Sequence, residues 1–334
     1  MPYLAELTSQ ITQAAARLPE PDRNRHVAFL RNAQQPDGGF SGRAGGSDVY
    51  YTSFALRGLF VLDALDGQVA RQAGAFLAAQ AGRPQNAVDL FAWLSSSRLV
   101  KAAGGNDCLA EAGMEPVSLV RQVFEPLCCP DGGVAKSTRS GASSTYHTFL
   151  AALCRESVGL PTENWDAIVS MLRARQREDG GFVELPVMRQ SGVNPTAAAI
   201  ALLRMGNALD ESLRETAGRY LIGMQTPSGG LQAHTSVPTA DLLSTFTGFL
   251  ALADLGRSDA LDLTAVRRFV EALAAPHGGY LAVAQDNCPD VEYTFYGIAA
   301  SALLADHHRQ SAVSSARSAG VRGDCRFDQY GTRQ

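Results

Sequence analysis

The sequence predicts a single all-helical domain built from about six copies of one helical hairpin, each of about 48 residues. Two observations carry this prediction: a glycine-pair motif recurs along the chain, and two kinds of helical segment alternate around it. The motif occurs as PDGGF at 36–40, PDGGV at 130–134, EDGGF at 178–182, PSGGL at 227–231 and PHGGY at 276–280.

The spacing of this motif gives the repeat length. Its first glycines are Gly38, Gly132, Gly180, Gly229 and Gly278, so the successive separations are 94, 48, 49 and 49 residues. The first separation covers two periods, which places a degenerate copy near AQAGRPQNAVDLFAW, where the glycine pair is missing. The repeats therefore occupy about residues 20–305, followed by a C-terminal tail at 306–334, within one domain that spans 1–334.

Each unit contains one helix on either side of the motif. The segment before the glycines has apolar residues at helical spacing, as at Leu213, Ala217 and Leu221. The motif then ends the helix, because glycine tolerates positive φ and proline cannot continue a helix. The later segment is apolar on most sides, so we expect it to be a buried inner helix. Inner helices are predicted over 48–62, 88–101, 143–156, 194–206, 240–255 and 290–305, with strands nearly absent.

A recurring threonine aligns the inner helices: Thr52, Thr148, Thr196, Thr245 and Thr294. Four residues earlier stand residue types that cap helices well, namely Asp48, Ser144, Gly192, Asp241 and Asp290. Three residues later stand small residues, namely Ala55, Ala151, Ala199, Gly248 and Gly297. These small residues have two interpretations. They allow close helix packing, or they face inward and leave a lumen open for a ligand.

Composition excludes several classes of function. The formal net charge is −4 and the pI is about 5.9, so there is no overall basic surface for nucleic acid. No apolar run approaches the roughly 20 residues that cross a bilayer. The N-terminal segment MPYLAELTSQITQAAARLPEPD lacks the pattern of a signal peptide and is expected to form an amphipathic helix. The six cysteines form no CxxC pair, so we expect reduced thiols and a cytoplasmic protein.

A helical hairpin of this length with a GGF-type turn resembles the α/α toroids, which include protein prenyltransferase β subunits, class II terpene and squalene cyclases, and complement thioester domains. The thioester motif GCGEQ and the cyclase motif DxDD are both absent. The resemblance is strongest to the farnesyl and geranylgeranyl transferase β subunits, through SGGLQAHTSVPTADLLSTFTGFL and HGGYLAVAQDNCPDVEYTFYGIAASALL. It implies an α/α toroid (an α6/α6 barrel) whose central apolar tunnel takes a C15–C20 prenyl chain.

The zinc ligands of that family are not retained. The resemblance places the family's Asp, Cys and His at Asp241, Leu243 and Tyr293, and these residues cannot supply the three ligands that zinc needs. We therefore expect no zinc, and we interpret Asp241 as a helix cap. A displaced metal site that joins Cys288 to Asp241 is the alternative.

The family's diphosphate-binding residues have also changed, to Gln190, His234 and Val237. Basic residues of the loops on one rim of the ring are candidates for a new diphosphate site, since a diphosphate needs several charged donors. These candidates are Lys136, Arg139, Arg189 and His234. The alternative is a rim that is merely solvated. Magnesium could accompany a bound diphosphate, and no other cofactor is expected.

Six inner-helix residues are candidates for the tunnel wall: Tyr51, Phe54, His147, Phe246, Tyr293 and Tyr296. Their alternative role is core packing, with His147 as a packed histidine that has a hydroxyl partner. No residue is identified as catalytic. The primary hypothesis is a prenyltransferase-like protein that binds an isoprenoid diphosphate and transfers the prenyl group without zinc. Alternatives are a non-enzymatic toroid that binds lipid or protein, or a relative of the terpene cyclases without the DxDD acid. The partner is either an α-subunit-like protein or a second copy of this chain.

Overall fold

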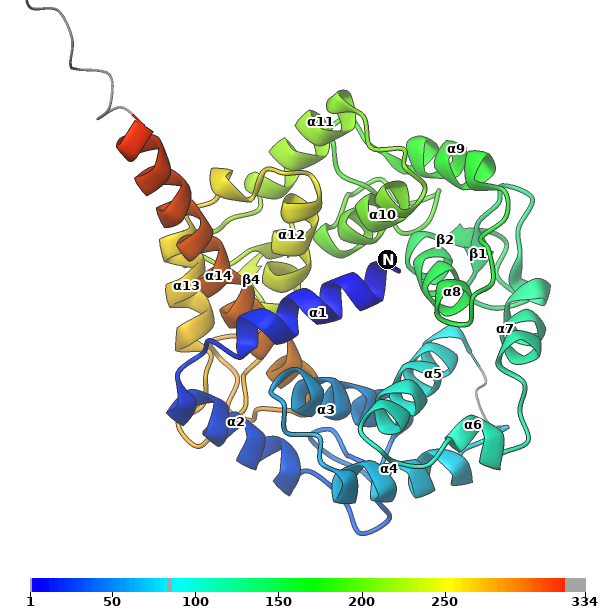
Figure 1. The fold of residues 1–334 in the computed structure, drawn as a ribbon. Helices are drawn as coiled ribbons and strands as arrows, with labels where there is room; N and C mark the ends of the chain where they lie inside the picture. The colour runs from blue at the N-terminus through cyan, green and yellow to red at the C-terminus, as the bar shows by residue number, and fades with distance from the viewer. Residues whose placement is uncertain (1, 83–85, 322–334) are drawn as a thin grey trace, which may run out of the picture.

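The computed structural model describes residues 2–82 and 86–321, and within them two concentric layers of helices form a closed ring (Figure 1). The inner layer contains α3 (Val49–Val61), α5 (Ala87–Ala102), α8 (Thr145–Ser157), α10 (Val193–Met205), α12 (Leu242–Asp254) and α14 (Val291–Val321). The outer layer contains α2 (Glu20–Asn32), α4 (Gly67–Ala79), α7 (Pro116–Phe124), α9 (Trp165–Arg175), α11 (Glu211–Ile222) and α13 (Leu263–Ala272). The predicted α/α toroid is confirmed.

The predicted inner helices agree with the observed ones to within two residues at every start and at every end except the last. There α14 continues to Val321, so the predicted tail at 306–334 begins inside a helix, and residues 322–334 lie outside the described part of the chain. The remaining helical elements are α1 (Tyr3–Ala15), α6 (Cys108–Glu111) and the short 3₁₀ turns η1 (Glu125–Leu127) and η2 (Ser258–Ala260). Two small antiparallel pairs join β1 (Val134–Ala135) to β2 (Ser143–Ser144) and β3 (Gln232–His234) to β4 (Val237–Ala240).

The recurring threonine ties each glycine turn to the inner helix that follows it. The backbone N–H of Leu231 donates to Thr245 Oγ1 at 2.9 Å, and that hydroxyl donates to the carbonyl of Asp241 at 2.7 Å. Equivalent bonds from the turn reach each of the other threonines, at Thr52, Thr148, Thr196 and Thr294. The threonine therefore satisfies a buried backbone donor that would otherwise be left unpaired.

The first glycine of each turn lies against the next outer helix. Gly38 has φ +89°, and a Cβ there would lie 2.1 Å from the carbonyl oxygen of Gln72 on α4. Gly278 in the last unit repeats this contact against Arg25 of α2 in the first unit, also at 2.1 Å. The backbone N–H of Gly279 also donates to His26 Nδ1 at 3.1 Å. The last turn therefore docks on the first outer helix and closes the ring.

The small residues on the inner helices face the glycine turns that precede those helices. A Cβ at Gly248 would lie 2.5 Å from the Leu231 side chain, and one at Gly297 would lie 2.2 Å from the Tyr280 ring. The alanines of the same register are buried, namely Ala55, Ala151 and Ala199. The interpretation as an open lumen is wrong for these positions. They stand three residues after the threonine, hence on the same helix face, which points to the turn.

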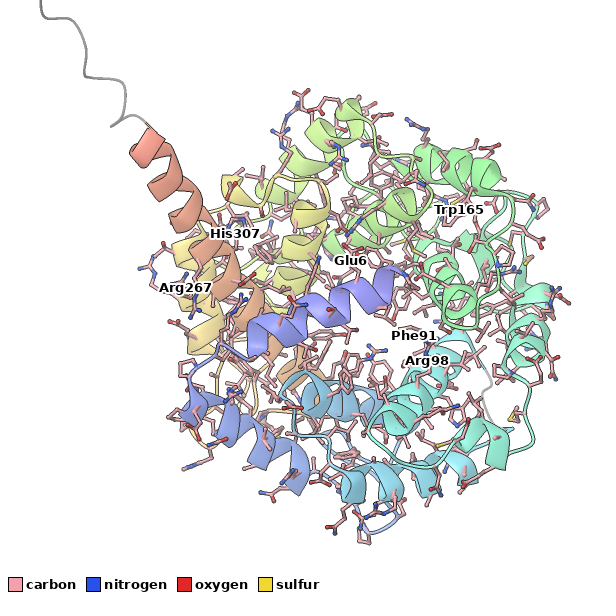
Figure 2. All side chains as sticks on the ribbon, in the orientation of Figure 1. Glu6, Phe91, Arg98, Trp165, Arg267 and His307 are labelled. Atoms are coloured by element: carbon pink, nitrogen blue, oxygen red, sulfur yellow. The ribbon has the colours of Figure 1, made fainter. Side chains whose placement is uncertain are left out.

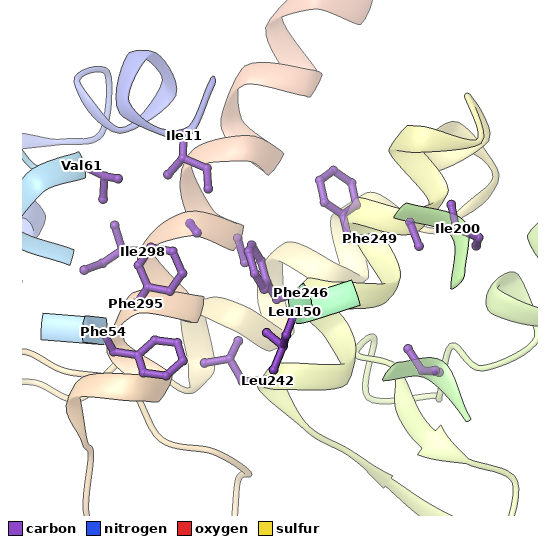
Figure 3. Packing of buried hydrophobic residues seen from close by; sticks show 14 of the residues in the cluster. Ile11, Phe54, Val61, Leu150, Ile200, Leu242, Phe246, Phe249, Phe295 and Ile298 are labelled. Carbon is purple, nitrogen blue, oxygen red and sulfur yellow. The ribbon is translucent and has the colours of Figure 1, made fainter. Parts of the chain in front are cut away.

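Larger apolar side chains lie on other faces of the inner helices. Phe54 of α3, Phe246 of α12 and Phe295 of α14 approach one another inside the ring (Figure 3), with ring centroids 5.9 Å apart for Phe54 and Phe295 and 6.2 Å apart for Phe246 and Phe295. Full burial of such a side chain contributes about 1.5–3 kcal/mol. Aromatic residues from both ends of the repeat array thus pack together where the ring closes.

Candidate functional site

The ring encloses a central cavity of about 1100 Å³, lined by all six inner helices and by α1. Its walls are largely apolar and aromatic, with Phe54, Phe91, Phe149, Phe246, Phe295 and Tyr296 among the lining residues. Binding sites for small molecules typically have volumes of about 300–1,000 Å³ and predominantly apolar walls with a few polar groups. The cavity is therefore large enough for an extended hydrophobic ligand.

Lining residues recur every three or four positions along each inner helix. On α3 they include Tyr50, Phe54, Arg57 and Val61. This spacing defines a single helix face, and it differs from the face that carries Thr52 and the small residues. One face of each inner helix therefore belongs to the ring and another to the cavity.

Helix α1 crosses the end of the ring at which the inner helices finish (Figure 1). Tyr3 Oη donates to Asp254 Oδ2 at 2.8 Å, and the backbone N–H of Tyr3 donates to Glu156 Oε2 at 2.8 Å. Arg204 forms ion pairs with both Glu6 and Asp254. Because Glu156, Arg204 and Asp254 lie in the last turns of α8, α10 and α12, α1 is fixed across three inner helices.

The cavity reaches the surface beside α1. Exposed residues of α1 and of the last turns of α5 belong to its lining, including Gln13, Arg98 and Ala102. In Figure 2, Phe91 and Arg98 of α5 lie across the centre of the ring from α1. This opening gives a ligand a route into the ring without displacement of an inner helix.

At the opposite end of the cavity, a carboxyl group is held by two phenols. Glu292 Oε1 accepts hydrogen bonds from Tyr50 Oη at 2.7 Å and from Tyr296 Oη at 3.3 Å. Burial raises the pKa of Glu292 above its usual value, because the charged form is poorly solvated there. Glu184 also lines this end, where its carboxylate accepts hydrogen bonds from Ser144 Oγ and from the backbone N–H of Tyr146.

A positive charge lies in the middle of the aromatic wall. The guanidinium carbon of Arg57 is 4.8 Å from the ring centroid of Phe91, 5.6 Å from that of Phe54 and 6.0 Å from that of Phe295. Arg57 Nη2 donates to Ser95 Oγ at 3.0 Å. Burial lowers the pKa of Arg57, since no ion pair with a carboxylate in residues 2–82 or 86–321 compensates for its desolvation.

Three of the six predicted tunnel residues line this cavity, and three do not. Phe54, Phe246 and Tyr296 belong to its wall. The other three, Tyr51, His147 and Tyr293, are not among its lining residues. The physical reason is helix geometry: Tyr51 and His147 directly follow lining residues Tyr50 and Tyr146, and one step along a helix turns the side chain by about 100°.

The three predicted residues that do not line the cavity make structural contacts elsewhere. Tyr51 packs against Gly42, and Tyr293 lies 5.8 Å from the guanidinium of Arg43. His147 is buried, and its Nδ1 shares a hydrogen bond of 2.9 Å with Ser144 Oγ. The alternative of a packed histidine with a hydroxyl partner is therefore what the structure shows.

The predicted diphosphate cluster lies outside the cavity. Lys136, Arg139 and Arg189 are exposed, and His234 is half-buried in β3. None of these four residues lines the cavity in the described part of the chain. Their binding of a diphosphate stays a prediction that would require a head group on the rim.

The residues at the family's zinc positions do not fit a zinc ion. Asp241 caps α12, with Oδ1 accepting from the backbone N–H of Ser244 and Oδ2 from its hydroxyl, both at 2.7 Å. Leu243 lines the cavity without a ligand atom. Among the described residues, no group of three or more His, Cys, Asp or Glu side chains is arranged to hold a metal ion, and the displaced site at Cys288 and Asp241 stays a prediction. That the protein works without zinc remains a prediction.

Sequence reasoning missed several polar residues of the cavity, among them Tyr50, Arg57, Ser95, Arg98, Glu184 and Glu292. One signal was available. Arg57 interrupts the apolar segment SFALRGLFVL, and a charge inside a helix that is expected to be buried calls for a partner or a ligand. Glu292 gave no comparable signal, since an acidic residue in the first turn of a helix is ordinary.

Comparison with known proteins gives consistent results. A family model described as the prenyltransferase alpha-alpha toroid domain matches residues 7–94 and 196–319. The chain is 33% identical over 147 residues to drimenyl diphosphate synthase of Streptantibioticus cattleyicolor. That match covers 40% of this chain and spans only 28% of the relative's length.

Solved structures share the fold at low identity. Candida albicans protein geranylgeranyltransferase-I complexed with GGPP superposes with a TM-score of 0.63 at 16% identity, covering 83% of this chain and 90% of that one. A type II terpene cyclase variant from Scytonema in complex with geranylgeranyl dihydroxybenzoate gives 0.56 at 16% identity, covering 91% and 98%. The described helices include none with the length and hydropathy of a membrane span. On its fold and its family match, the chain belongs to the prenyltransferase alpha-alpha toroid family.

Proposed function

We propose that the central cavity binds an isoprenoid chain that carries an anionic head, such as a diphosphate. The observation that carries this proposal is the aromatic cavity of about 1100 Å³ at the centre of the ring. The names of the similar proteins support it, since they refer to GGPP, a geranylgeranyl compound and drimenyl diphosphate. Burial of a C15 chain contributes on the order of 10 kcal/mol at about 0.8 kcal/mol per CH₂, before the entropic costs of binding.

Calorimetric titration of farnesyl and geranylgeranyl diphosphate tests this proposal. The blocking variant is Ala197→Trp, because Ala197 lies on the cavity face of α10 and is only partly buried. Its matched control is Ala75→Trp, on the exposed surface of the outer helix α4. We expect micromolar binding by the wild type and by the control, and none by the blocking variant. Absence of binding to the wild type at high micromolar ligand, or equal binding by Ala197→Trp, would contradict the proposal.

A second candidate function is cyclisation of the bound isoprenoid, started by a proton from Glu292. The specific observation is a carboxyl with a raised pKa, held by Tyr50 and Tyr296 at an aromatic end of the cavity. Transfer of its proton to a terminal double bond would leave a carboxylate and a tertiary carbocation. The faces of Phe54, Phe246 and Phe295 would stabilise that cation. Ring closure and loss of a proton from the product to a base would complete an isomerisation, in which no atom is gained or lost.

Prenyl transfer without zinc needs an acceptor molecule, whereas cyclisation needs only the bound chain and an acid. The two reactions differ in their products: transfer releases diphosphate, and cyclisation retains it. Product analysis after incubation with farnesyl or geranylgeranyl diphosphate therefore separates them. Binding without any conversion would favour the non-enzymatic alternative, a lipid-binding toroid.

A further inference from the structure

We propose that Arg57, together with Ser53 and Ser95, forms an oxyanion-binding site inside the ring that takes the head group of the cavity's ligand. This inference rests on the proposed binding of an isoprenoid and adds where the head is held. The chemistry suits a diphosphate or a carboxylate, since either offers several acceptor oxygens to a guanidinium. The head group would then lie inside the cavity and not at the rim cations Lys136, Arg139 and Arg189.

Arg57 has no counter-charge in the described part of the chain. A guanidinium has five N–H donors, and among the described residues this one makes a single hydrogen bond, to Ser95. No ion pair reaches it from any carboxylate of residues 2–82 and 86–321, although its head lies among aromatic rings. A desolvated charge without a partner is costly, and a bound anion would remove that cost.

Two serine hydroxyls lie close to Arg57 on the cavity wall. Ser53 lies one helical turn before it on α3, and its Oγ is 3.3 Å from Ser95 Oγ on α5. Arg98 follows Ser95 by three residues and also lines the cavity, near its opening. The two hydroxyls and the Arg57 guanidinium thus lie together between α3 and α5. In the empty cavity Ser95 Oγ donates to the carbonyl of Phe91 at 2.8 Å, and the Arg98 guanidinium donates to the carbonyl of Ser157 at the end of α8. Arg57 and Arg98 are the basic residues among the described lining residues.

Arg57 and Glu292 lie at different depths along the cavity. Tyr50, which binds Glu292, precedes Arg57 by seven residues on α3, or about 10 Å at 1.5 Å per residue. A head at Arg57 would direct a prenyl chain past Phe54 and Phe295 toward the carboxyl of Glu292. The opening beside α1 lies at the Arg98 end, so the polar head would lie closer to that opening than the hydrocarbon. At the other end, Tyr146 is an exposed lining residue.

The packing of Arg57 on aromatic rings is also consistent with a purely structural role, and apo stability separates the two roles. Methionine has a similar length without the charge. If Arg57 serves ligand binding and does not stabilise the fold, the melting temperature of Arg57→Met without ligand should be equal to or above that of the wild type. A clear fall in melting temperature would mean that the guanidinium stabilises the empty protein, which would overturn this part of the argument.

The binding test compares farnesyl diphosphate, farnesoic acid and farnesol by calorimetric titration. The proteins are the wild type, Arg57→Met and the matched rim control Arg189→Met. We expect the wild type and the control to prefer an anionic ligand over the alcohol by about tenfold or more, the effect of one charged hydrogen bond. Arg57→Met should lose that preference and bind farnesol as before. Whether diphosphate or carboxylate binds more tightly identifies the head group.

Other outcomes separate this inference from the proposed function. Equal binding of the anionic ligands and the alcohol by the wild type, or loss of the preference in Arg189→Met but not in Arg57→Met, would overturn the site and leave isoprenoid binding intact. If the wild type binds no farnesyl compound, the proposed function fails, and titration with inorganic pyrophosphate still tests the site. Pyrophosphate binding that Arg57→Met abolishes would support the site, and no pyrophosphate binding would overturn it.

Discussion

Each inner helix has one face whose residues are nearly constant between the repeat units and another face whose residues vary. The face toward the outer layer is nearly the same in five units, with a threonine that binds the glycine turn and a small residue one turn later. The face toward the cavity changes from unit to unit, with Arg57 on α3, Ala197 on α10 and Glu292 on α14. The repeated face builds the ring, and the varied face makes its interior chemically different from one side to the other. Substitutions on the two faces should therefore separate stability from function.

The largest expected effect is on the varied face, at Glu292. If Glu292 starts a cyclisation, Glu292→Gln should lower turnover by about 10²–10⁴-fold, the usual contribution of a general acid. Its folding stability should change little, because the amide can still accept a hydrogen bond from Tyr50. Product formation is measured by chromatography of the dephosphorylated extract. Undiminished turnover in the variant would exclude Glu292 as the acid.

The pH dependence gives a second test of Glu292. A general acid acts in its protonated form, so turnover should fall as pH rises through the pKa of this carboxyl, which burial places above its ordinary value. In deuterated water the product should carry one deuterium from the starting proton. A rate that instead rises through the same range would point to a carboxylate acting as a base.

On the repeated face, the turn glycines should have the largest effect on stability. Gly180 has φ +89°, and a Cβ there would lie 2.3 Å from the carbonyl of Thr216. Gly180→Ala should lower the free energy of unfolding by about 2–3 kcal/mol or more, from backbone strain and the clash together. Gly45→Ala is the control, since Gly45 also has positive φ but no atom within 4 Å. Urea unfolding that gives equal losses would show that the close contact contributes nothing.

Loss of a recurring threonine should lower the free energy of unfolding by less than loss of a turn glycine. Thr245→Val keeps the shape but leaves the buried N–H of Leu231 without an acceptor, which costs about 1–3 kcal/mol. Ligand affinity should be unchanged, because Thr245 points away from the cavity. A large loss of affinity with normal stability would contradict the division between the two faces.

The smallest expected effect is a pH dependence at the ring closure. Burial, and after it the positive charge of Arg25, lower the pKa of His26 to about 4. The ring of His26 accepts the N–H of Gly279 and stacks on Tyr280. The unfolded chain binds a proton near pH 6.5 and the folded one does not, so stability should fall as pH drops from about 6.5 to 4. The drop should be about 1–3 kcal/mol larger in the wild type than in His26→Gln. Parallel pH profiles for the two proteins would rule out this contribution.

These two faces also explain how much the sequence could predict. Repetition is visible in a single sequence, so the turn glycines, the threonine and the helix bounds can be predicted from it. Together they predict the ring. The cavity face has no repeat to reveal it. The sequence predicts Tyr51 and Tyr293 at the cavity, whereas the structure places Tyr50 and Glu292 there, because a register fixed on the threonine does not say which neighbouring position turns toward the axis. The position of α1 across the ring depends on contacts such as Tyr3 to Asp254, which are distant in sequence.

A crystal structure with geranylgeranyl diphosphate would show whether the varied face forms an isoprenoid site. We expect a prenyl chain among Phe54, Phe246 and Phe295, with the diphosphate within hydrogen-bonding distance of Arg57. A diphosphate bound at Lys136 or Arg189 on the rim would contradict the internal head-group site. A ligand bound outside the ring, with the central cavity free of hydrocarbon, would contradict the isoprenoid site itself.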